Sequence, residues 1–168
     1  MYRYQILIEY VGTNFVGWQI QSKGRSIQKL IQTKLSKILK EKILLVGSGR
    51  TDAGVHAIAQ SAHFECKKEI QDLNKFLKSI NHFVNNMNIS IIRVKKKNLR
   101  FHARFSAKER VYKYVIFNRL SRPSIFQHHD DLILVLLYDS GMLAFYLDWL
   151  LQHQMNLLYF EDEIFLQV

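Results

Sequence analysis

The order of periodic segments along the chain is the feature that most constrains its fold. From residue 4 to residue 10 apolar side chains recur with a period of two, which predicts a strand. Ser26 is a candidate N-cap for a helix that runs to about Lys40, and Asp72 is a candidate N-cap for a second helix. Further strands are predicted over residues 43–46, 57–64, 89–95 and 111–117, and residues 101–105 are expected to be extended.

These segments follow one another as β-α-β-β-α-β with an added strand. This is the split βαβ order of ferredoxin-like α+β domains, and such a sheet can expose a face on which RNA bases stack. We therefore expect residues 1–123 to form one domain. From 124 to 168 the periodicity weakens, and we expect an irregular or helical tail in which Met142, Phe145, Tyr146 and Trp149 share one side of a helix.

The charge of the chain divides at the same place. The net charge is +10, yet all 24 Lys and Arg residues lie at or before Arg122, together with seven of the 14 acidic residues. That part carries a surplus of +17, whereas residues 123–168 contain seven acids and no Lys or Arg. A surplus of this size predicts a polyanionic partner such as RNA or DNA, although a basic surface that only keeps the protein soluble explains the charge equally well.

The stretch from Gly47 to His56 stands out between two predicted strands. It holds three glycines, and between them lie Arg50, a threonine and the lone carboxylate of Asp52. Glycines allow sharp turns and a close approach to a ligand, so a carboxylate here is a candidate for chemistry. The ordinary alternative is that Asp52 caps a helix or stabilises a turn.

Other features limit the function classes. A single cysteine excludes an intramolecular disulfide framework. No N-terminal signal is apparent, and the apolar runs, such as 132–138, are too short to span a bilayer, so we expect a cytoplasmic protein without membrane contact. The run from His128 to Asp131 offers metal ligands, but adjacent residues do not converge easily on one ion, and we expect no metal.

Five segments together resemble the tRNA pseudouridine synthase A family. Beside the loop 49–56, with Gln60 and residues 63–64 downstream, the similar segments are residues 9–10 leading to 17–19, 26–28, 101–107 and 110–114. The resemblance covers roughly residues 2–123. It implies the pseudouridine synthase half-fold and the isomerisation of uridine to pseudouridine in the anticodon arm of tRNA, with no cofactor and no metal.

The resemblance also implies roles for site residues. Asp52 corresponds to the catalytic carboxylate, which acts either as a nucleophile at the sugar or as a base at C2′, and the sequence does not choose between them. Arg50 is associated with the RNA and the displaced nucleotide. Tyr112 takes the place of the ring that packs against the flipped uracil. By spacing alone Tyr112 could equally be a core strand tyrosine, and Tyr114 shares its strand face.

RNA phosphates are the implied partners of Arg104, Arg110 and Lys113. His56 and His102 belong to the matched motifs, and we expect both to be structural, hydrogen-bonding histidines. Members of the family continue with a second half that supplies the other wall of the cleft, a basic residue near the catalytic carboxylate and much of a homodimer contact.

Nothing after Phe126 resembles that second half. This loss predicts a frameshift or a gene fragment, which the other two reading frames of the downstream DNA would test. Three functional readings follow: a tRNA pseudouridine synthase, a truncated and catalytically inactive RNA-binding fragment, or a degraded fragment that folds poorly.

Overall fold

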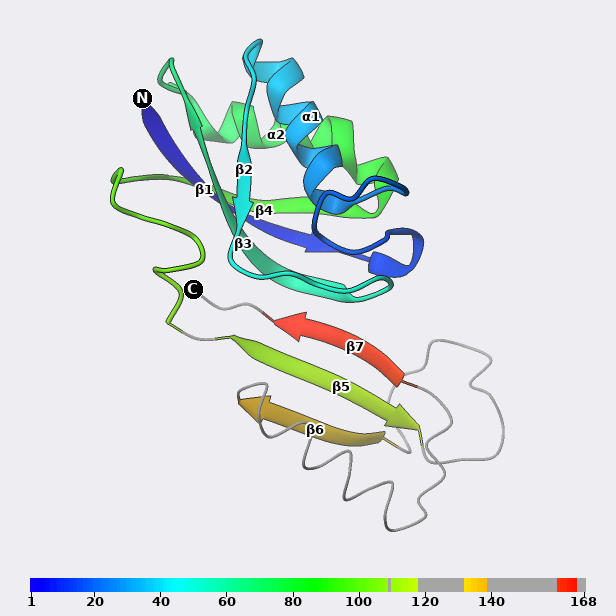
Figure 1. The fold of residues 1–168 in the computed structure, drawn as a ribbon. Coiled ribbons are helices and arrows are strands. Elements are labelled where there is room, and N and C mark those ends of the chain that lie inside the picture. Colours follow the sequence, from blue (N-terminus) through cyan, green and yellow to red (C-terminus); the bar gives the residue numbers. More distant parts are fainter. Residues whose placement is uncertain (109, 118–131, 139–159, 166–168) are drawn as a thin grey trace.

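The computed structural model describes residues 1–108, 110–117, 132–138 and 160–165 (Figure 1). Residues 2–97 contain four strands and two helices in the predicted order. They are β1 Tyr2–Tyr10, α1 Ile27–Leu39, β2 Leu45–Gly47, β3 His56–Cys66, α2 Leu73–Val84 and β4 Ile89–Lys97. Short 3-10 helices follow β1 at Gly12–Asn14 and α2 at Asn85–Met87, and β5 Val111–Phe117 is the added strand.

The sheet has the split βαβ topology that the sequence predicts. β1 lies between β4 and β3, and β2 pairs with β3, with every one of these pairs antiparallel. The register sets Ile6 opposite Ala62 on one side and opposite Val94 on the other. Beyond this unit, β7 Phe160–Phe165 pairs in parallel with the start of β3, and β5 lies between β7 and β6 Leu132–Tyr138.

One face of the sheet forms the core with the two helices. The even-numbered residues of β1 and the apolar stripes of both helices are buried in a single cluster, and the fully buried members include Tyr4, Ile6, Ile8, Ile27, Ile31, Leu35 and Ile80. Each side chain of this size contributes roughly 1.5–3 kcal/mol when it leaves water. The period-two pattern of apolar residues on β1 and the helical pattern on α1 and α2 are therefore both explained by burial in the same cluster.

The two predicted helix caps differ in the structure. Asp72 accepts a hydrogen bond from Lys75 N at 2.8 Å, which confirms it as the N-cap of α2. Ser26 occupies the N-cap position of α1, but its side chain makes no capping hydrogen bond, and its buried Oγ has no partner among the described residues. The helix nevertheless begins there, because its apolar stripe is buried against the sheet.

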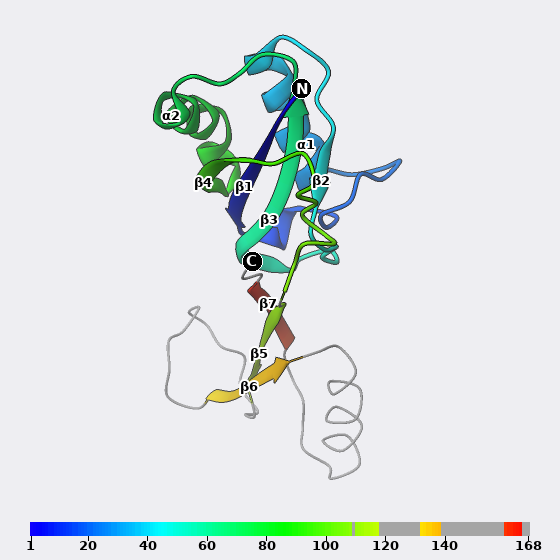
Figure 2. The same ribbon diagram turned by 90° about the vertical axis from the view of Figure 1, so that its left-hand side faces the viewer.

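The segment after β4 covers part of the opposite sheet face. Figure 2 shows α2 on one side of β1 and β3 and this segment on the other. The expectation that residues 101–105 are extended is wrong, because Ser106 N donates to His102 O at 2.7 Å and closes a turn. Within the turn Ala103 is fully buried and donates its N–H to His63 Nδ1 at 3.1 Å. The sheet face expected to receive bases is therefore partly occupied by the chain itself.

Two described parts of the tail are strands, where the sequence predicts irregular or helical structure. β6 is a run of Leu, Ile and Val residues that ends in Tyr138, and its Ile, Val and Tyr residues are types enriched in strands. The helix predicted to carry Met142, Phe145, Tyr146 and Trp149 on one side lies outside the described residues. Among the helices of the described residues, none is long and apolar enough to cross a membrane.

Candidate active site

The glycine-rich loop between β2 and β3 packs against the chain that follows β1. Trp18 N donates to Thr51 O at 3.0 Å. Gly17 has a φ of +100°, and a Cβ at this position would lie 2.4 Å from the same carbonyl oxygen. A Cβ on Gly12 would lie 1.9 Å from Val55 O. These two glycines let the loop backbone lie directly against the chain after β1, which fixes the loop in position.

A buried chain of hydrogen bonds holds both neighbours of Arg50. The Tyr10 hydroxyl donates to Gln60 Oε1 at 2.7 Å, and Gln60 Nε2 donates to Gly49 O at 2.9 Å. Because the one hydroxyl proton of Tyr10 goes to Gln60, Thr51 Oγ1 donates to the Tyr10 oxygen, 2.9 Å away. Burial raises the pKa of Tyr10, so its hydroxyl stays protonated and the chain of donors keeps its direction.

Asp52 directly follows the anchored Thr51. Its carbonyl oxygen accepts a hydrogen bond from Val55 N at 3.3 Å, and its backbone lies against Gly17. The side chain is exposed, and within the described ranges no hydrogen bond or ion pair holds its carboxylate. A carboxylate on a fixed backbone with no competing partner can face a bound substrate as a nucleophile or as a base.

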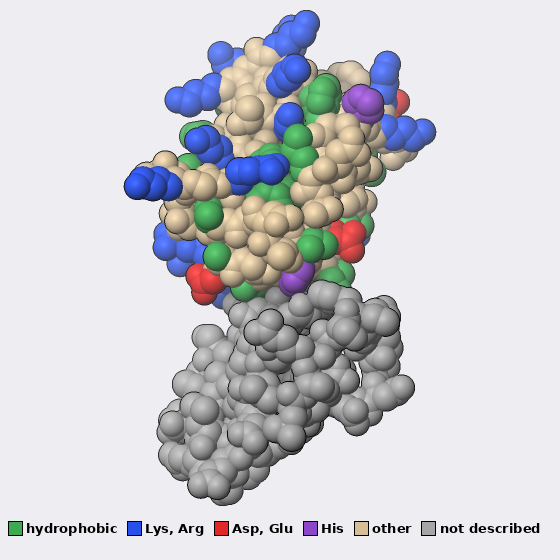
Figure 3. All heavy atoms as spheres, turned by 90° about the vertical axis from the view of Figure 1, so that its right-hand side faces the viewer, with side chains coloured by type: hydrophobic (Ala, Val, Ile, Leu, Met, Phe, Trp, Pro, Cys, Tyr) green, Lys and Arg blue, Asp and Glu red, His purple; other side chains and the backbone are tan. Residues whose placement is uncertain are grey.

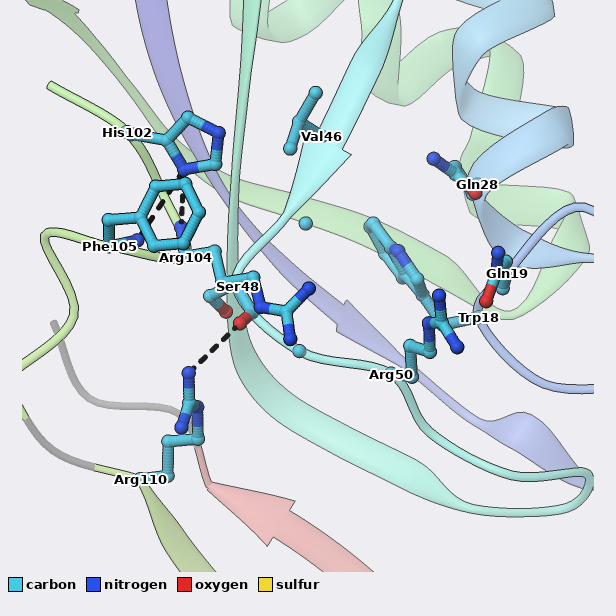
Figure 4. A pocket seen from close by; sticks show the side chains of 12 residues that line it. Trp18, Gln19, Gln28, Val46, Ser48, Arg50, His102, Arg104, Phe105 and Arg110 are labelled. Carbon is cyan, nitrogen blue, oxygen red and sulfur yellow. Dashed lines mark hydrogen bonds between the residues drawn. The ribbon is translucent and has the colours of Figure 1, made fainter.

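Three arginines from separate parts of the chain line one cavity of about 640 Å³. Arg50 comes from the glycine-rich loop, Arg104 from the segment after β4, and Arg110 from the residue before β5 (Figure 4). Arg110 also donates to Ser48 O at 3.3 Å. The lining residues that the structure describes include no Asp or Glu. A cavity with this lining attracts anions such as RNA phosphates.

The basic character extends beyond the cavity. On the face shown in Figure 3, Lys and Arg side chains outnumber Asp and Glu side chains. A basic surface of this kind attracts anionic partners.

Two histidines connect the segment after β4 to the sheet. The His63 and His102 rings lie 4.7 Å apart, and His63 accepts the N–H of Ala103. Burial, and then the neighbouring His102, lowers the pKa of His63 to about 4, so the ring is neutral near pH 7 and its Nδ1 can accept. His102 Nδ1 in turn accepts from Arg104 N at 3.2 Å. This arrangement fixes the backbone that carries Arg104.

The predicted site residues fall into two groups. The structure brings three of them together around the cavity, namely Arg50, Arg104 and Arg110. Asp52 lies two residues beyond Arg50 and is not among the lining residues. Tyr112 and Lys113 lie on β5, where their backbones pair with β6 and β7, and their side chains lie outside what the structure describes.

The remaining sequence features are the two motif histidines and the candidate metal ligands. His56 Nδ1 accepts from Gly12 N at 3.3 Å, and His102 makes the backbone contacts given above, which fits the structural role expected for both. Among the described residues no group of three or more His, Cys, Asp or Glu side chains could hold a metal ion. The run from His128 to Asp131 lies outside those residues.

Sequence reasoning did not assign roles to several residues of this site. Tyr10, Trp18 and Gln60 entered it only as members of motifs, and Phe105 only as a position in the 101–107 segment. Membership of these motifs is the signal in the sequence that could have marked these residues as part of the site. Tyr10, for example, acts through contacts with Thr51 and Gln60, which are 41 and 50 residues away in the sequence, and no local pattern reveals them.

Fold and site together define an α+β domain that presents a carboxylate on a rigid glycine-rich loop beside an arginine-lined cavity. A family model described as tRNA pseudouridine synthase matches residues 6–106. The chain is 74% identical over 125 residues to the tRNA pseudouridine synthase A of Pelagibacter ubique (strain HTCC1062), covering 74% of this chain and 51% of that protein. It is 43% identical over 124 residues to the enzyme of the same name from Ehrlichia ruminantium (strain Gardel), covering 73% and 50%.

The chain belongs to the tRNA pseudouridine synthase family. The matched range contains the whole glycine-rich loop, the Tyr10 hydrogen-bond chain and the turn at 102–106. The chain spans about half the length of the curated relatives it matches.

Proposed function

We propose that this chain isomerises uridine to pseudouridine in the anticodon arm of tRNA, with Asp52 as its catalytic carboxylate. The reaction breaks the N1–C1′ bond, turns the uracil and joins its C5 to C1′. The C5 proton leaves to solvent and N1 gains a proton, so the product is an isomer of the substrate. The proposed reaction uses no cofactor and no metal. Membership of the family carries the proposal, which describes a cytoplasmic tRNA-modifying enzyme.

The surroundings of Asp52 support its catalytic role. The Tyr10 hydrogen-bond chain anchors Thr51, and Trp18 holds the Thr51 carbonyl. Reaction at C1′ or C2′ requires a carboxylate held at one place while the base moves, and proper positioning of a reacting group lowers the barrier by several kcal/mol. Asp52 has a fixed backbone and an exposed side chain, which suits this requirement.

The target uridine must leave its stack before Asp52 can reach the sugar. Arg50 lies two residues from Asp52 and lines the cavity, so it is suited to hold the displaced nucleotide or its phosphate. We assign Tyr112 as the ring that packs against the flipped uracil, on the basis of its place in the motif after Arg110.

Arg104, Arg110 and Lys113 are proposed phosphate contacts. Replacing Arg104 by Gln removes one cation from the cavity, so we expect the slope of log affinity for tRNA against log salt to fall by roughly 0.7–0.9. Lys78→Gln on the exposed face of α2 is the matched control, because it removes the same charge outside the cavity. Slopes for both variants equal to that of the wild type would show that Arg104 contacts no phosphate.

The position of the product tests the anticodon-arm assignment. Unmodified tRNA transcripts incubated with the full chain should acquire pseudouridine in the anticodon arm, as mapped by carbodiimide labelling and reverse transcription. Uridines of the other arms serve as internal controls. Modification confined to another arm would refute the assignment while leaving the isomerase activity intact.

A second candidate function is RNA binding without turnover. It is favoured by the Asp52 carboxylate, which lacks a cationic partner within the described residues. This function predicts salt-sensitive tRNA binding that Asp52→Ala leaves unchanged, with no pseudouridine formed. Any turnover that depends on Asp52 excludes it.

A further inference from the structure

Phe105 is an unusual surface residue, because it is 80% exposed although the backbone around it is fixed. The turn that carries it is closed by two hydrogen bonds between His102 and Ser106, and Phe105 N lies 3.4 Å from its acceptor, His102 Nδ1. Single exposed apolar residues are common on protein surfaces. A large ring held rigidly in water next to a basic cavity calls for a more specific explanation.

The ring continues a row of aromatic side chains that begins inside the protein. His63 lies edge-on to Phe101 at 6.1 Å and 4.7 Å from His102, and the Phe105 ring lies 4.4 Å from His102 at an interplanar angle of 31°. His63 is buried, whereas Phe105 ends the row at the cavity (Figure 4). One ring face is thus supported by protein, and the exposed surface can receive another flat ring.

The charges around the ring identify the kind of flat ring that fits. Arg104 is its neighbour in the chain, and Arg50 and Arg110 line the same cavity, while the described lining contains no acid. Figure 4 shows Phe105 and His102 on one side of the cavity and Trp18 and Arg50 on the other. An aromatic platform among cations is the usual means of binding single-stranded nucleic acid, because the ring stacks a base and the cations contact phosphates.

We infer that Phe105 is a stacking platform for an unpaired RNA base, distinct from the residue that packs against the reacting uracil. The inference rests on the proposed RNA substrate and adds to it a second base contact, in the cavity lined by the three arginines. The stacked base is a neighbour of the target, and its binding orients the strand for reaction at Asp52. Stacking reads any base, so this contact contributes affinity and placement, not base specificity.

The test compares how tightly the full chain binds two single-stranded ligands of equal charge. One is a short oligouridylate, and the other is an abasic strand with the same number of phosphates. The variants are Phe105→Ala, Phe105→Leu, which keeps apolar bulk without a π face, and Phe105→Trp, which keeps the face. Leu99→Ala, an exposed apolar residue outside the cavity, is the matched control.

The platform predicts that Phe105→Ala and Phe105→Leu each weaken oligouridylate binding by roughly 5- to 150-fold, with no change for the abasic strand. Phe105→Trp should bind like the wild type and show quenching of its added fluorescence by oligouridylate only, after subtraction of the wild-type signal. Leu99→Ala should behave as the wild type throughout.

Three results would overturn the inference. The first is equal oligouridylate affinity for the wild type and the Phe105→Ala variant. The second is equal quenching of the Phe105→Trp variant by both strands. The third is a wild-type dimer that Phe105→Ala dissociates without loss of oligouridylate binding, which would make Phe105 a protein contact. Isomerase turnover is measured separately, so turnover without stacking removes only this inference, and stacking without turnover removes only the proposed function.

Discussion

Replacing Tyr10 by Phe tests how the glycine-rich loop that carries Asp52 is held. The substitution removes the hydroxyl that joins Thr51 to Gln60 and leaves the ring in place against Trp18, 6.2 Å away. Gln60 is fully buried and Thr51 is 6% exposed, so water cannot readily replace the lost partner. The substitution leaves Gln60 without its hydrogen-bond donor, and an unsatisfied buried polar group costs about 1–3 kcal/mol. The Thr51 hydroxyl can rotate away from the lost partner, so it adds less to the cost. We therefore expect a loss of about 2–3 kcal/mol in unfolding free energy.

Tyr4→Phe is the matched control on the same strand. Tyr4 is fully buried as well, but its hydroxyl accepts one hydrogen bond, from Ile70 N at 2.9 Å, far from the loop. Ile70 is only half-buried, so water can reach the released N–H and the expected loss is about 1 kcal/mol. Both variants remove one hydroxyl from one tyrosine, and only Tyr10→Phe disturbs the loop.

Urea denaturation and hydrogen exchange give the two readouts. In Tyr10→Phe, the Gly54 and Val55 amides, which donate to Phe15 O and Asp52 O, should exchange faster, whereas in Tyr4→Phe the acceleration should stay near Ile70. A loop displaced by about 1 Å should also lower turnover by roughly 100-fold. Equal stability losses with equal loop protection in the two variants would refute the view that Tyr10 anchors the loop.

Two further predictions concern the same site. His63 has a pKa of about 4 in the folded protein, below its ordinary value. The unfolded chain therefore binds a proton at this ring more readily than the folded protein does. The stability that this ring contributes is fully present above about pH 6.5, and about 1–3 kcal/mol of unfolding free energy is lost as the pH falls from there to 4. His63→Gln should lack that part of the pH dependence in urea melts, and an unchanged slope would contradict it. Gly17→Ala adds a Cβ at a φ of +100° and 2.4 Å from Thr51 O. We expect it to lower the unfolding free energy by more than about 1 kcal/mol in thermal melts and to lower turnover. Wild-type stability and wild-type turnover would contradict the close packing of Gly17 against the loop.

The order of strands and helices from β1 to β4 is predicted correctly from the sequence, because the pattern of buried residues coincides with the secondary-structure periods. The alternation on β1 and the stripes of α1 and α2 all point into one cluster. The turn at 102–106 was missed because it depends on hydrogen bonds to His63 and between His102 and Ser106, which a local pattern does not contain. The apolar run of β6 carries no clear period that separates a strand from a short helix.

The candidate site was predictable as a set of residues but not as a geometry. Asp52, Arg50, Arg104 and Arg110 come from motifs, and three of them line one cavity in the structure. The role of Tyr10 could not be foreseen, since a buried aromatic residue on an alternating strand reads as core until its hydroxyl is seen to reach Thr51 and Gln60.

Release of tritium from tRNA labelled at C5 of uridine tests the central claim most directly, because the C5 proton is lost only when pseudouridine forms at the labelled base. We predict that the wild-type chain releases tritium and that Asp52→Asn lowers the rate by at least about 100-fold while tRNA affinity is kept. Asp72→Asn makes the same substitution at the N-cap of α2, where Asn caps as well as Asp, and should keep the wild-type rate. A wild-type rate for Asp52→Asn, or no release by a wild-type chain that binds tRNA, would contradict the account.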